Sequence, residues 1–540
     1  MRAAPLAPSS AAATFSRREK DSQWRCRFHP PTFVILKHPA QDAPVNSLSS
    51  EPNMTNDVSP GSHDHHHERR RWIALLVLCM GVLMIVLDTT IVNVALPSIK
   101  TDLKFTDTAL AWVVNAYMLT YGGFLLLGGR LGDLYGHRRF FLLGIALFTL
   151  ASLACGLSQT QGFLVASRAV QGLGGAVVTA VALSLIMDLF TEAADRAKAM
   201  GIYGFVCAGG GSLGAMLGGV LTSTLTWHWV FLVNLPIGIA VIVFAPKLLP
   251  ATKGASDTRH LDVSGAVTVT AALMLAVYAI VNGNEMGWTS ARTLGELAVA
   301  AVLLALFFVI EARVRKPLMP LRLFVRRNIA VSNTVGVLWA AAMFAWFFLS
   351  ALYMQLVLGY GPLEVGLAFL PANLIMALFS LGISARLVMR FGIRKPLAAG
   401  LALAALGLLL FARAPLDGHY VIDIMPGMIL LGLGAGIALN PVLLAAMNDV
   451  EPSESGLASG LVNTAFMMGG ALGLAVLASL AASQTGMALA DGAGRGAALL
   501  VGYRAAFLAG ACFAALGAVL GATLLRPRDV AASEAAMSTH

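Results

Sequence analysis

The sequence Leu87-Asp-Thr-Thr-Ile-Val-Asn-Val-Ala-Leu-Pro97 lies inside an apolar run that begins at Trp72, directly after three arginines. About 25 residues of helix from Trp72 span about 37 Å, enough to cross the hydrocarbon core of a bilayer. Asp88 then lies near the middle of that span, where an ionised carboxylate costs about 2.5–3.5 kcal/mol. A helix keeps such a residue when it binds a proton, pairs with a cation or is satisfied by Thr and Asn neighbours. We expect a proton- or cation-handling site and keep a structural carboxylate as the alternative.

The composition is that of a polytopic membrane protein. Of 540 residues, 57% are hydrophobic and only 12% are charged, whereas soluble proteins carry about 25% charged residues. The net charge of +9 does not indicate a nucleic-acid partner, because the basic residues cluster at the ends of apolar runs, as a topology signal does. The five cysteines occur singly and predict neither a disulfide framework nor a metal site.

Both ends of the chain differ from its centre. Residues 1–71 are rich in Pro, Ser and charge, which predicts a disordered cytoplasmic tail, and residues 527–540 form a second, short cytoplasmic tail. Met54 is a plausible start close to the first span, so we expect 1–53 to be an upstream misannotation. The histidines of 63–67 are expected to be solvated rather than to bind a metal.

Apolar runs long enough to span a membrane recur from Trp72 to Leu525. They predict fourteen helices, at 73–97, 108–129, 139–158, 163–188, 198–222, 229–247, 264–283, 294–312, 329–353, 364–389, 395–412, 421–444, 456–482 and 502–525. The fold class is therefore all-α. The predicted domains are an N-terminal six-helix bundle (72–250), an inserted helix pair with linkers (251–328) and a C-terminal six-helix bundle (329–526).

The charges of the predicted loops give the orientation. One set of loops carries most of the Lys and Arg residues, among them Arg69–Arg71, Arg138, Arg139 and Arg394, and the opposite set carries few. Because positive loops stay inside, both termini are predicted to be cytoplasmic.

A weak repeat and several short motifs identify a family. Gly129-Arg-Leu-Gly-Asp-Leu-Tyr-Gly-His-Arg-Arg139 follows the second helix, and a related stretch, Ala385–Lys395, follows the tenth. Parallel six-helix repeats are typical of transporters. With Leu87–Pro97, Trp112–Tyr117 and Trp229–Gly238, these motifs make the chain resemble the major facilitator superfamily, in particular its fourteen-span drug:proton antiporter branch of EmrB/QacA type. The resemblance implies the major facilitator fold.

The resemblance also implies roles for residues inside the helices. Asp88 becomes a candidate protonation site lining a central cavity, which can load a proton from one face and release it to the other. Arg168, in Arg168-Ala-Val-Gln-Gly-Leu-Gly, matches the buried-arginine motif, which implies that Arg168 tunes proton release. A purely structural role for Arg168 is the alternative. A guanidinium inside a span needs an acceptor, and the interior offers few acids besides Asp88. Gln171 and Gly172 are expected to serve packing and polar contacts between helices.

Two glycine-containing motifs are expected to set helix contacts. In the family, the loop motif latches the cytoplasmic gate, which implies gating roles for Gly129, Asp133, Gly136, Arg138 and Arg139. Asp133 is expected to meet a helix N-terminus or an arginine, and Arg138 and Arg139 to cross the seam between the halves. In the second motif, small residues allow close helix approach; its packing residues are Gly210, Gly214, Gly218 and Gly219. The family has proline after the central glycine, where this chain has Ala215, so an expected kink is lost.

Polar groups on the predicted helices are candidates for substrate binding, and each could equally join helices to one another. They are Asn93, Asn115, Tyr117, Tyr353, Gln355, Asn373, Asn440 and Asn463.

The resulting prediction is a secondary active exporter of drugs or other small amphipathic compounds, working by proton antiport and alternating access in the inner membrane. It is not an enzyme and uses no cofactor other than the proton gradient. We expect a monomeric transport unit, with a periplasmic adaptor and an outer-membrane channel left open. The alternatives are export of one specific metabolite, lipid or siderophore, and, more remotely, a membrane enzyme or a non-transporting sensor.

Overall fold

The computed structural model describes residues 61–106, 108–250, 262–314, 317–319, 321–447 and 455–526. Its first helix, α1 (Gly61–Leu103), contains the apolar run around Asp88 and begins before the predicted boundary at residue 72. The prediction of a tail through residue 71 is therefore wrong for 61–71. Two contacts hold α1 near Arg70 and Arg71: Arg70 donates to the Lys247 carbonyl at 2.6 Å, and the Arg71 guanidinium lies 3.9 Å from the Asp195 carboxylate. The predictions for 1–60 and 527–540 lie outside the described residues.

The remaining helices of the first half follow closely on one another. They are α2 (Trp112–Tyr135), α3 (His137–Gly156), α4 (Gln161–Leu189), α5 (Ala193–Thr224), α6 (Trp229–Leu232) and α7 (Asn234–Leu248). Gly136 separates α2 from α3 with φ of +101°, a conformation that favours glycine. Thr160 caps α4 by accepting from the Phe163 N–H at 3.3 Å. α5, without the motif proline, runs as one uninterrupted helix over 32 residues.

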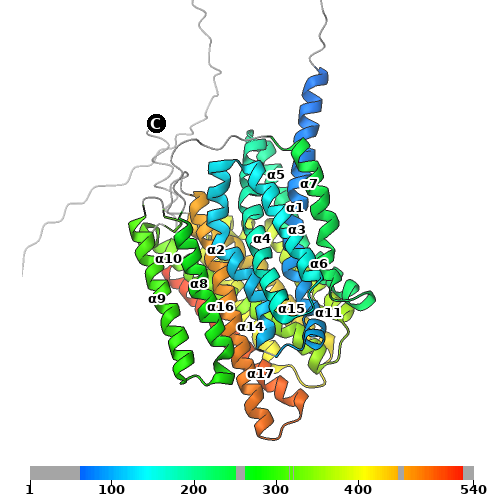
Figure 1. Ribbon diagram of the computed structural model, residues 1–540, viewed down its shortest axis with the longest axis vertical. Helices are drawn as coiled ribbons and strands as arrows, with labels where there is room; N and C mark the ends of the chain where they lie inside the picture. The colour runs from blue at the N-terminus through cyan, green and yellow to red at the C-terminus, as the bar shows by residue number, and fades with distance from the viewer. Residues whose placement is uncertain are drawn as a thin grey trace, which may run out of the picture. The chain divides into compact units, whose positions relative to one another are not determined.

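The predicted inserted pair is present as α8 (Val263–Met286) and α9 (Ala291–Arg313). Side chains cap both helices: Asp262 accepts from the Gly265 N–H and Ser290 from the Thr293 N–H. α8 packs on α9 and also contacts α2 and α16 (Ser455–Ala490). In Figure 1 the pair lies at the side of the bundle, next to α16. The charges and motif spacing of the sequence do not predict this position, because it depends on contacts of α8 with α2 and α16.

The second half begins with α10 (Arg327–Leu352), which continues as a π-helical turn at Tyr353–Val357. The predicted tenth helix, 364–389, is divided into α11 (Pro362–Ala368), α12 (Leu370–Leu378), a π-helical turn at Phe379–Ile383 and α13 (Ser384–Phe391). Then follow α14 (Arg394–Arg413), a π-helical turn at Tyr420–Ile424, α15 (Met425–Met447), α16 and α17 (Arg495–Leu524).

The described residues contain helices and no strands, which confirms the all-α class. Thirteen of these helices are long and apolar enough to cross a membrane, and the broken segment from Pro362 is shorter. Within the first half α4 packs on α2 and α3, and α1 packs on α5; within the second, α14 packs on α15 and α17, and α10 on α16. Across the halves, α2 contacts α16, and α5 contacts α11 and α12.

The helices of the bundle end at two faces, which we call the arginine face and the opposite face. The arginine face carries the start of α1 at Arg70, the end of α7 at Leu249 and the end of α17 at Arg526. The opposite face carries the end of α1 at Asp102 and the turns around Gly359 and Gly492. Figure 1 shows the α1 start and the α16–α17 turn at opposite ends of the helices.

Candidate functional site

The site is built around Asp88 on α1 and Arg168 on α4. Their side chains form an ion pair and are 0% and 1% exposed. Arg168 Nη1 donates to Asp88 Oδ2, so the pairing that the sequence led us to expect is present. Two opposite charges in contact neutralise each other, which lowers the cost of holding either one inside a helix bundle.

Three further side chains surround the carboxylate. Gln171 Nε2 and Asn234 Nδ2 donate to Asp88 Oδ1 at 2.8 and 3.2 Å. The same two nitrogens donate to Ser152 Oγ at 3.2 and 2.9 Å. Ser152 in turn donates to the Phe231 carbonyl at 2.9 Å. We call Gln171, Asn234 and Ser152 the amide cage of Asp88; all three are buried.

Arg168 has acceptors on two sides besides the carboxylate. Its Nε donates to the Val113 carbonyl at 2.9 Å, and its Nη1 also donates to Gln171 Oε1 at 2.7 Å. The guanidinium carbon lies 4.4 Å from the centroid of the Tyr117 ring and 5.6 Å from that of Phe231, and aromatic faces attract cations. In this arrangement each oxygen of the Asp88 carboxylate accepts at least one hydrogen bond.

Sequence reasoning missed most of the amide cage. Gln171 was expected to serve packing and polar contacts between helices, and it bonds both members of the ion pair. Asn234 was noted only as part of the motif opening the sixth segment, and Ser152 was not singled out. A usable signal existed for Asn234, because it is the only polar side chain between Trp229 and Pro246.

The substrate-binding candidates divide into two groups. Several donate hydrogen bonds to backbone carbonyls: Asn93 donates to Thr89 O within α1, Tyr353 to Pro415 O, Gln355 to Val94 O and Asn440 to Ser380 O. Asn463 is exposed. The structure therefore does not bring all eight to one place.

The other candidates are buried and still have free hydrogen-bonding atoms. Asn115 is 0% exposed, and neither of its polar side-chain atoms has a hydrogen-bond partner among the described residues. Tyr117 Oη and Asn373 Nδ2 are likewise unpartnered in the described part of the chain. Buried polar groups are nearly always paired, so these atoms are available to a substrate or to water. Tyr117 lies beside the ion pair, with its ring 4.4 Å from the Arg168 guanidinium carbon.

The glycines of α5 pack against two different helices. A Cβ at Gly210, Gly214 or Gly218 would meet α1, at Val86, Thr90 and the Ile91 carbonyl respectively. A Cβ at Gly219 would instead lie 2.7 Å from the Pro362 carbonyl oxygen on α11. Gly366 on α11 would meet the Ala215 carbonyl in the same way, at 2.6 Å. This motif therefore fixes α5 to α1 and also closes α5 against the second half.

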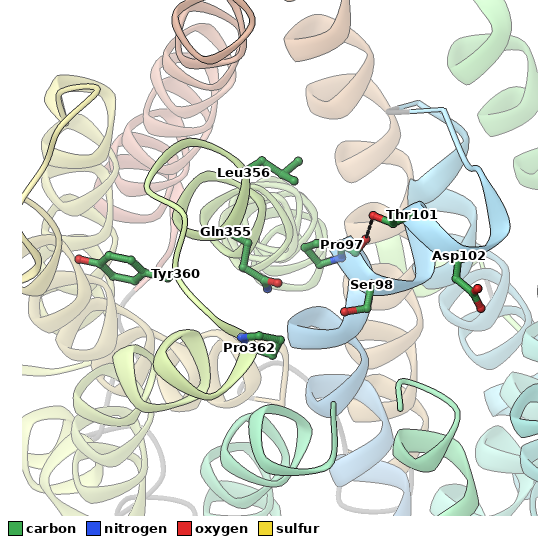
Figure 2. A pocket seen from close by; sticks show the side chains of 8 residues that line it. All are labelled: Pro97, Ser98, Thr101, Asp102, Gln355, Leu356, Tyr360 and Pro362. Carbon is green, nitrogen blue, oxygen red and sulfur yellow. Dashed lines mark hydrogen bonds between the residues drawn. The ribbon is translucent and has the colours of Figure 1, made fainter. Parts of the chain in front are cut away.

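The opposite face is closed by one further bond between the halves. Gln355 Nε2 donates to the Val94 carbonyl of α1 at 2.9 Å. Outside this bond lies a pocket of about 590 Å³, lined by Pro97, Ser98, Thr101, Asp102, Gln355, Leu356, Tyr360 and Pro362. Figure 2 shows α1 residues along one side of it and Gln355, Leu356 and Pro362 along the other. The pocket therefore lies over the seam between the halves.

The candidate gating residues form a cluster within the first half. His137 bridges Asp133 at 3.1 Å and Asp188 at 3.0 Å, and Arg138 donates to the Leu249 carbonyl at 3.2 Å. The expectation that Arg138 crosses the seam between the two halves is wrong in this structure, because the Leu249 carbonyl that it contacts belongs to the same half. Asp133 meets the side chain of His137, the first residue of α3, instead of an arginine. Arg139 is exposed. Gly129 makes no close helix contact, since a Cβ placed on it would lie 3.6 Å from the Ala180 Cβ, an ordinary van der Waals distance.

A bundle of membrane-length helices with a buried ion pair at its centre has the architecture of a membrane transporter. The Major Facilitator Superfamily model matches residues 78–474, and the chain belongs to that family.

Several curated relatives are named for drug resistance or export. The chain is 38% identical to the puromycin resistance protein pur8 of Streptomyces alboniger, over 86% of this chain and 93% of that protein. It is 40% identical to the cephamycin export protein CmcT of Amycolatopsis lactamdurans, over 76% and 85%. It is 35% identical to the multidrug resistance protein Stp of Mycobacterium tuberculosis, over 77% and 76%.

Solved structures show the same fold at low sequence identity. The POT family transporter PepTSo superposes with a TM-score of 0.62 at 15% identity, covering 83% of this chain and 97% of that one. The inward-open xylose transporter XylE from E. coli superposes with a TM-score of 0.56 at 14% identity, over 85% and 97%. The predicted major facilitator fold is confirmed.

Proposed function

We propose that this protein exports drugs or other small amphipathic compounds across the cytoplasmic membrane in exchange for protons. The observation that carries the proposal is the buried pair of Asp88 and Arg168, since no other described side chains form an ion pair with both members under 2% exposed. The relatives named for puromycin, cephamycin and multidrug resistance support a drug-like substrate.

Protonation of Asp88 supplies the coupling. While the carboxylate is ionised, the pair has no net charge and the interior tolerates it. A proton on Asp88 leaves Arg168 as an uncompensated buried cation, which is unfavourable in a low-dielectric interior. A conformation in which Arg168 meets water or another acceptor then becomes relatively more stable, and the halves rock.

Energetically, one proton is sufficient for useful work. One elementary charge crossing 100 mV is worth about 2.3 kcal/mol, to which a pH difference adds. This drives an uncharged substrate against a concentration gradient.

The proposal includes an orientation and a subclass. The arginine face is cytoplasmic, because it gathers the loop arginines, and the opposite face is extracellular. The six-two-six order of helices fits the fourteen-span EmrB/QacA type. The transport unit is a monomer that uses no cofactor; a periplasmic adaptor and outer-membrane channel extend the route only in a cell with an outer membrane.

A narrower substrate range is the second candidate. Relatives named for cephamycin export and for tetracenomycin C resistance and export favour export of one compound or one chemical class. A substrate panel separates the two, because a narrow exporter lowers the accumulation of one class only.

The test is proton-driven efflux of ethidium, a fluorescent lipophilic cation, in inverted membrane vesicles. We expect the natural protein to transport and Asp88→Asn to lose at least roughly tenfold in rate, because the proton site is gone. Asp491→Asn is the matched control, since Asp491 is an exposed carboxylate in the α16–α17 turn.

Each result has a distinct meaning. Full transport by Asp88→Asn at equal expression contradicts proton coupling at Asp88. Failure of the natural protein to transport any compound of a broad panel, puromycin included, contradicts drug export.

A further inference from the structure

The orientation of the Asn234 side chain is fixed by its neighbours. Ser152 donates its only hydroxyl proton to the Phe231 carbonyl, so Ser152 Oγ can only accept from Asn234. The amide nitrogen must therefore face both Ser152 and Asp88. The amide oxygen, Asn234 Oδ1, points elsewhere, is buried and has no hydrogen-bond partner among the described residues.

This amide cage fits only the ionised carboxylate. Asp88 Oδ1 accepts from two amide nitrogens and Oδ2 accepts from Arg168, so each hydrogen-bond partner of the carboxylate among the described residues is a donor. A proton on Oδ1 would point at the hydrogens of Gln171 and Asn234 and find no acceptor. One of the two amides must turn over before the protonated acid is accommodated.

Only one of the two amides is free to turn. Gln171 Oε1 accepts from Arg168 Nη1 at 2.7 Å, and turning Gln171 would set its NH2 group against the guanidinium. Asn234 Oδ1 has no such bond to lose. If Asn234 turns, its oxygen accepts from the Asp88 O–H, and the Ser152 hydroxyl rotates away from Phe231 to donate to that same oxygen.

We propose that Asn234 is a positioning residue whose side-chain amide changes orientation with the protonation state of Asp88. Its amide and the Ser152 hydroxyl turn together when the proton binds. The inference rests on proton coupling at Asp88, as proposed above. It deepens that proposal by linking the proton to the Phe231 carbonyl on α6, and so to the sixth segment. The step moves one proton and exchanges hydrogen bonds; no covalent bond other than O–H changes.

The other ionisable groups facing the cage do not substitute for Asp88. They are Arg168 on α4, Cys155 on α3, whose Sγ lies 3.7 Å from Gln171 Oε1, and Tyr117 on α2, whose ring lies under the guanidinium. Arginine stays charged, and the ordinary ranges of a thiol and a phenol lie well above that of a carboxyl group.

The test is infrared difference spectroscopy of the purified protein between acid and alkaline pH. We expect a protonated-carboxyl C=O band that disappears in Asp88→Asn. In Asn234→Leu, which is similar in size but has no polar atom, the band should move to higher wavenumber, because the acid has lost its acceptor. Asn333→Leu is the matched control, since Asn333 is a buried asparagine on α10, remote from the cage in the contacts it makes.

A transport measurement accompanies the spectra. Proton-driven efflux by Asn234→Leu should fall roughly tenfold or more, whereas substrate exchange without a proton gradient should stay within about twofold, which a merely structural defect would not allow. Asn234→Ser, whose hydroxyl can donate or accept, should fall between Asn234→Leu and the natural protein in both measurements.

The outcomes separate the two proposals. Absence of any band that depends on Asp88 overturns proton coupling at that residue. A band that depends on Asp88 but is unmoved in both Asn234→Leu and Asn234→Ser overturns the role of Asn234 alone.

Discussion

The guanidinium of Arg168 and the carboxylate of Asp88 are each buried almost completely, and each compensates the other. Arg168→Leu should therefore destabilise the protein by about 3–5 kcal/mol, because a buried charge is left without its partner. The double variant Asp88→Asn with Arg168→Leu should recover part of that loss, since no uncompensated charge remains. Thermal unfolding in detergent measures both, and strictly additive losses would contradict the pairing.

At the scale of single residues, the sequence predicted the charged members of the site better than the uncharged side chains that surround them. Asp88 and Arg168 stand out because each interrupts an apolar run, and their pairing follows from the scarcity of alternatives. Ser152 and Asn234 could not be paired in advance, because their contact requires α3 and α7 to meet in one register. Gln355 was predicted as a substrate group, but its amide bonds the backbone of α1.

The glycine motif of α5 packs against two helices, α1 and α11. Gly219→Val should force α5 away from α11, because even a Cβ would lie 2.7 Å from a backbone oxygen there. Overpacking of this kind costs about 1–3 kcal/mol, which shifts a two-state equilibrium roughly 5- to 150-fold. The opposite face should open more often as a result.

Thiol labelling measures this opening. In a background without native cysteines, Val94→Cys, at a fully buried position beside the Gln355 bond, should react faster with a membrane-impermeant thiol reagent when Gly219→Val is present. Gly209→Val is the control, since nothing lies within 4 Å of a Cβ at that position of the same helix. Equal labelling in both variants would show that Gly219 does not hold this closure.

Element boundaries were predicted only approximately. The predicted second helix ends at residue 129 and the third begins at 139, whereas α2 continues to Tyr135 and α3 begins at His137, on either side of Gly136. The predicted continuous helix 364–389 is broken instead, in part because Pro371 has no N–H to donate to the preceding turn, where α11 ends at Ala368. The π-helical turn after α12 has no comparable sequence signal, because it depends on packing against α15 and α5.

For the whole molecule, the proposed orientation places both ends of the chain in the cytoplasm. Green fluorescent protein fused after His540 should fluoresce, and alkaline phosphatase fused there should be inactive, because each folds on only one side of the inner membrane. The reverse should hold for fusions after Gly492, in the α16–α17 turn. Active phosphatase at His540 would overturn the orientation.

The family was readable from motif order, and hydropathy predicted fourteen spans, of which thirteen are membrane-length helices in the described residues. The position of the inserted pair was not readable in this way. α8 contacts both α2 and α16, and Asn284 Nδ2 on α8 donates to Ser479 O on α16 at 2.7 Å. A built Cβ at Gly123 on α2 would touch Thr270 of α8. The pair thus covers the α2–α16 seam.

The second seam, between α5 and the α11–α13 segment, has no such cover among the described helices. Toward the arginine face, nothing lies within 4 Å of a Cβ built at Gly201, Gly204 or Gly209 on α5, or at Gly382 on the π-helical turn. A compound dissolved in the inner leaflet of the bilayer therefore meets a blocked side and an accessible side. Lateral entry from the lipid phase is expected at the accessible side, so export should follow a compound's oil–water partition coefficient more closely than its aqueous concentration.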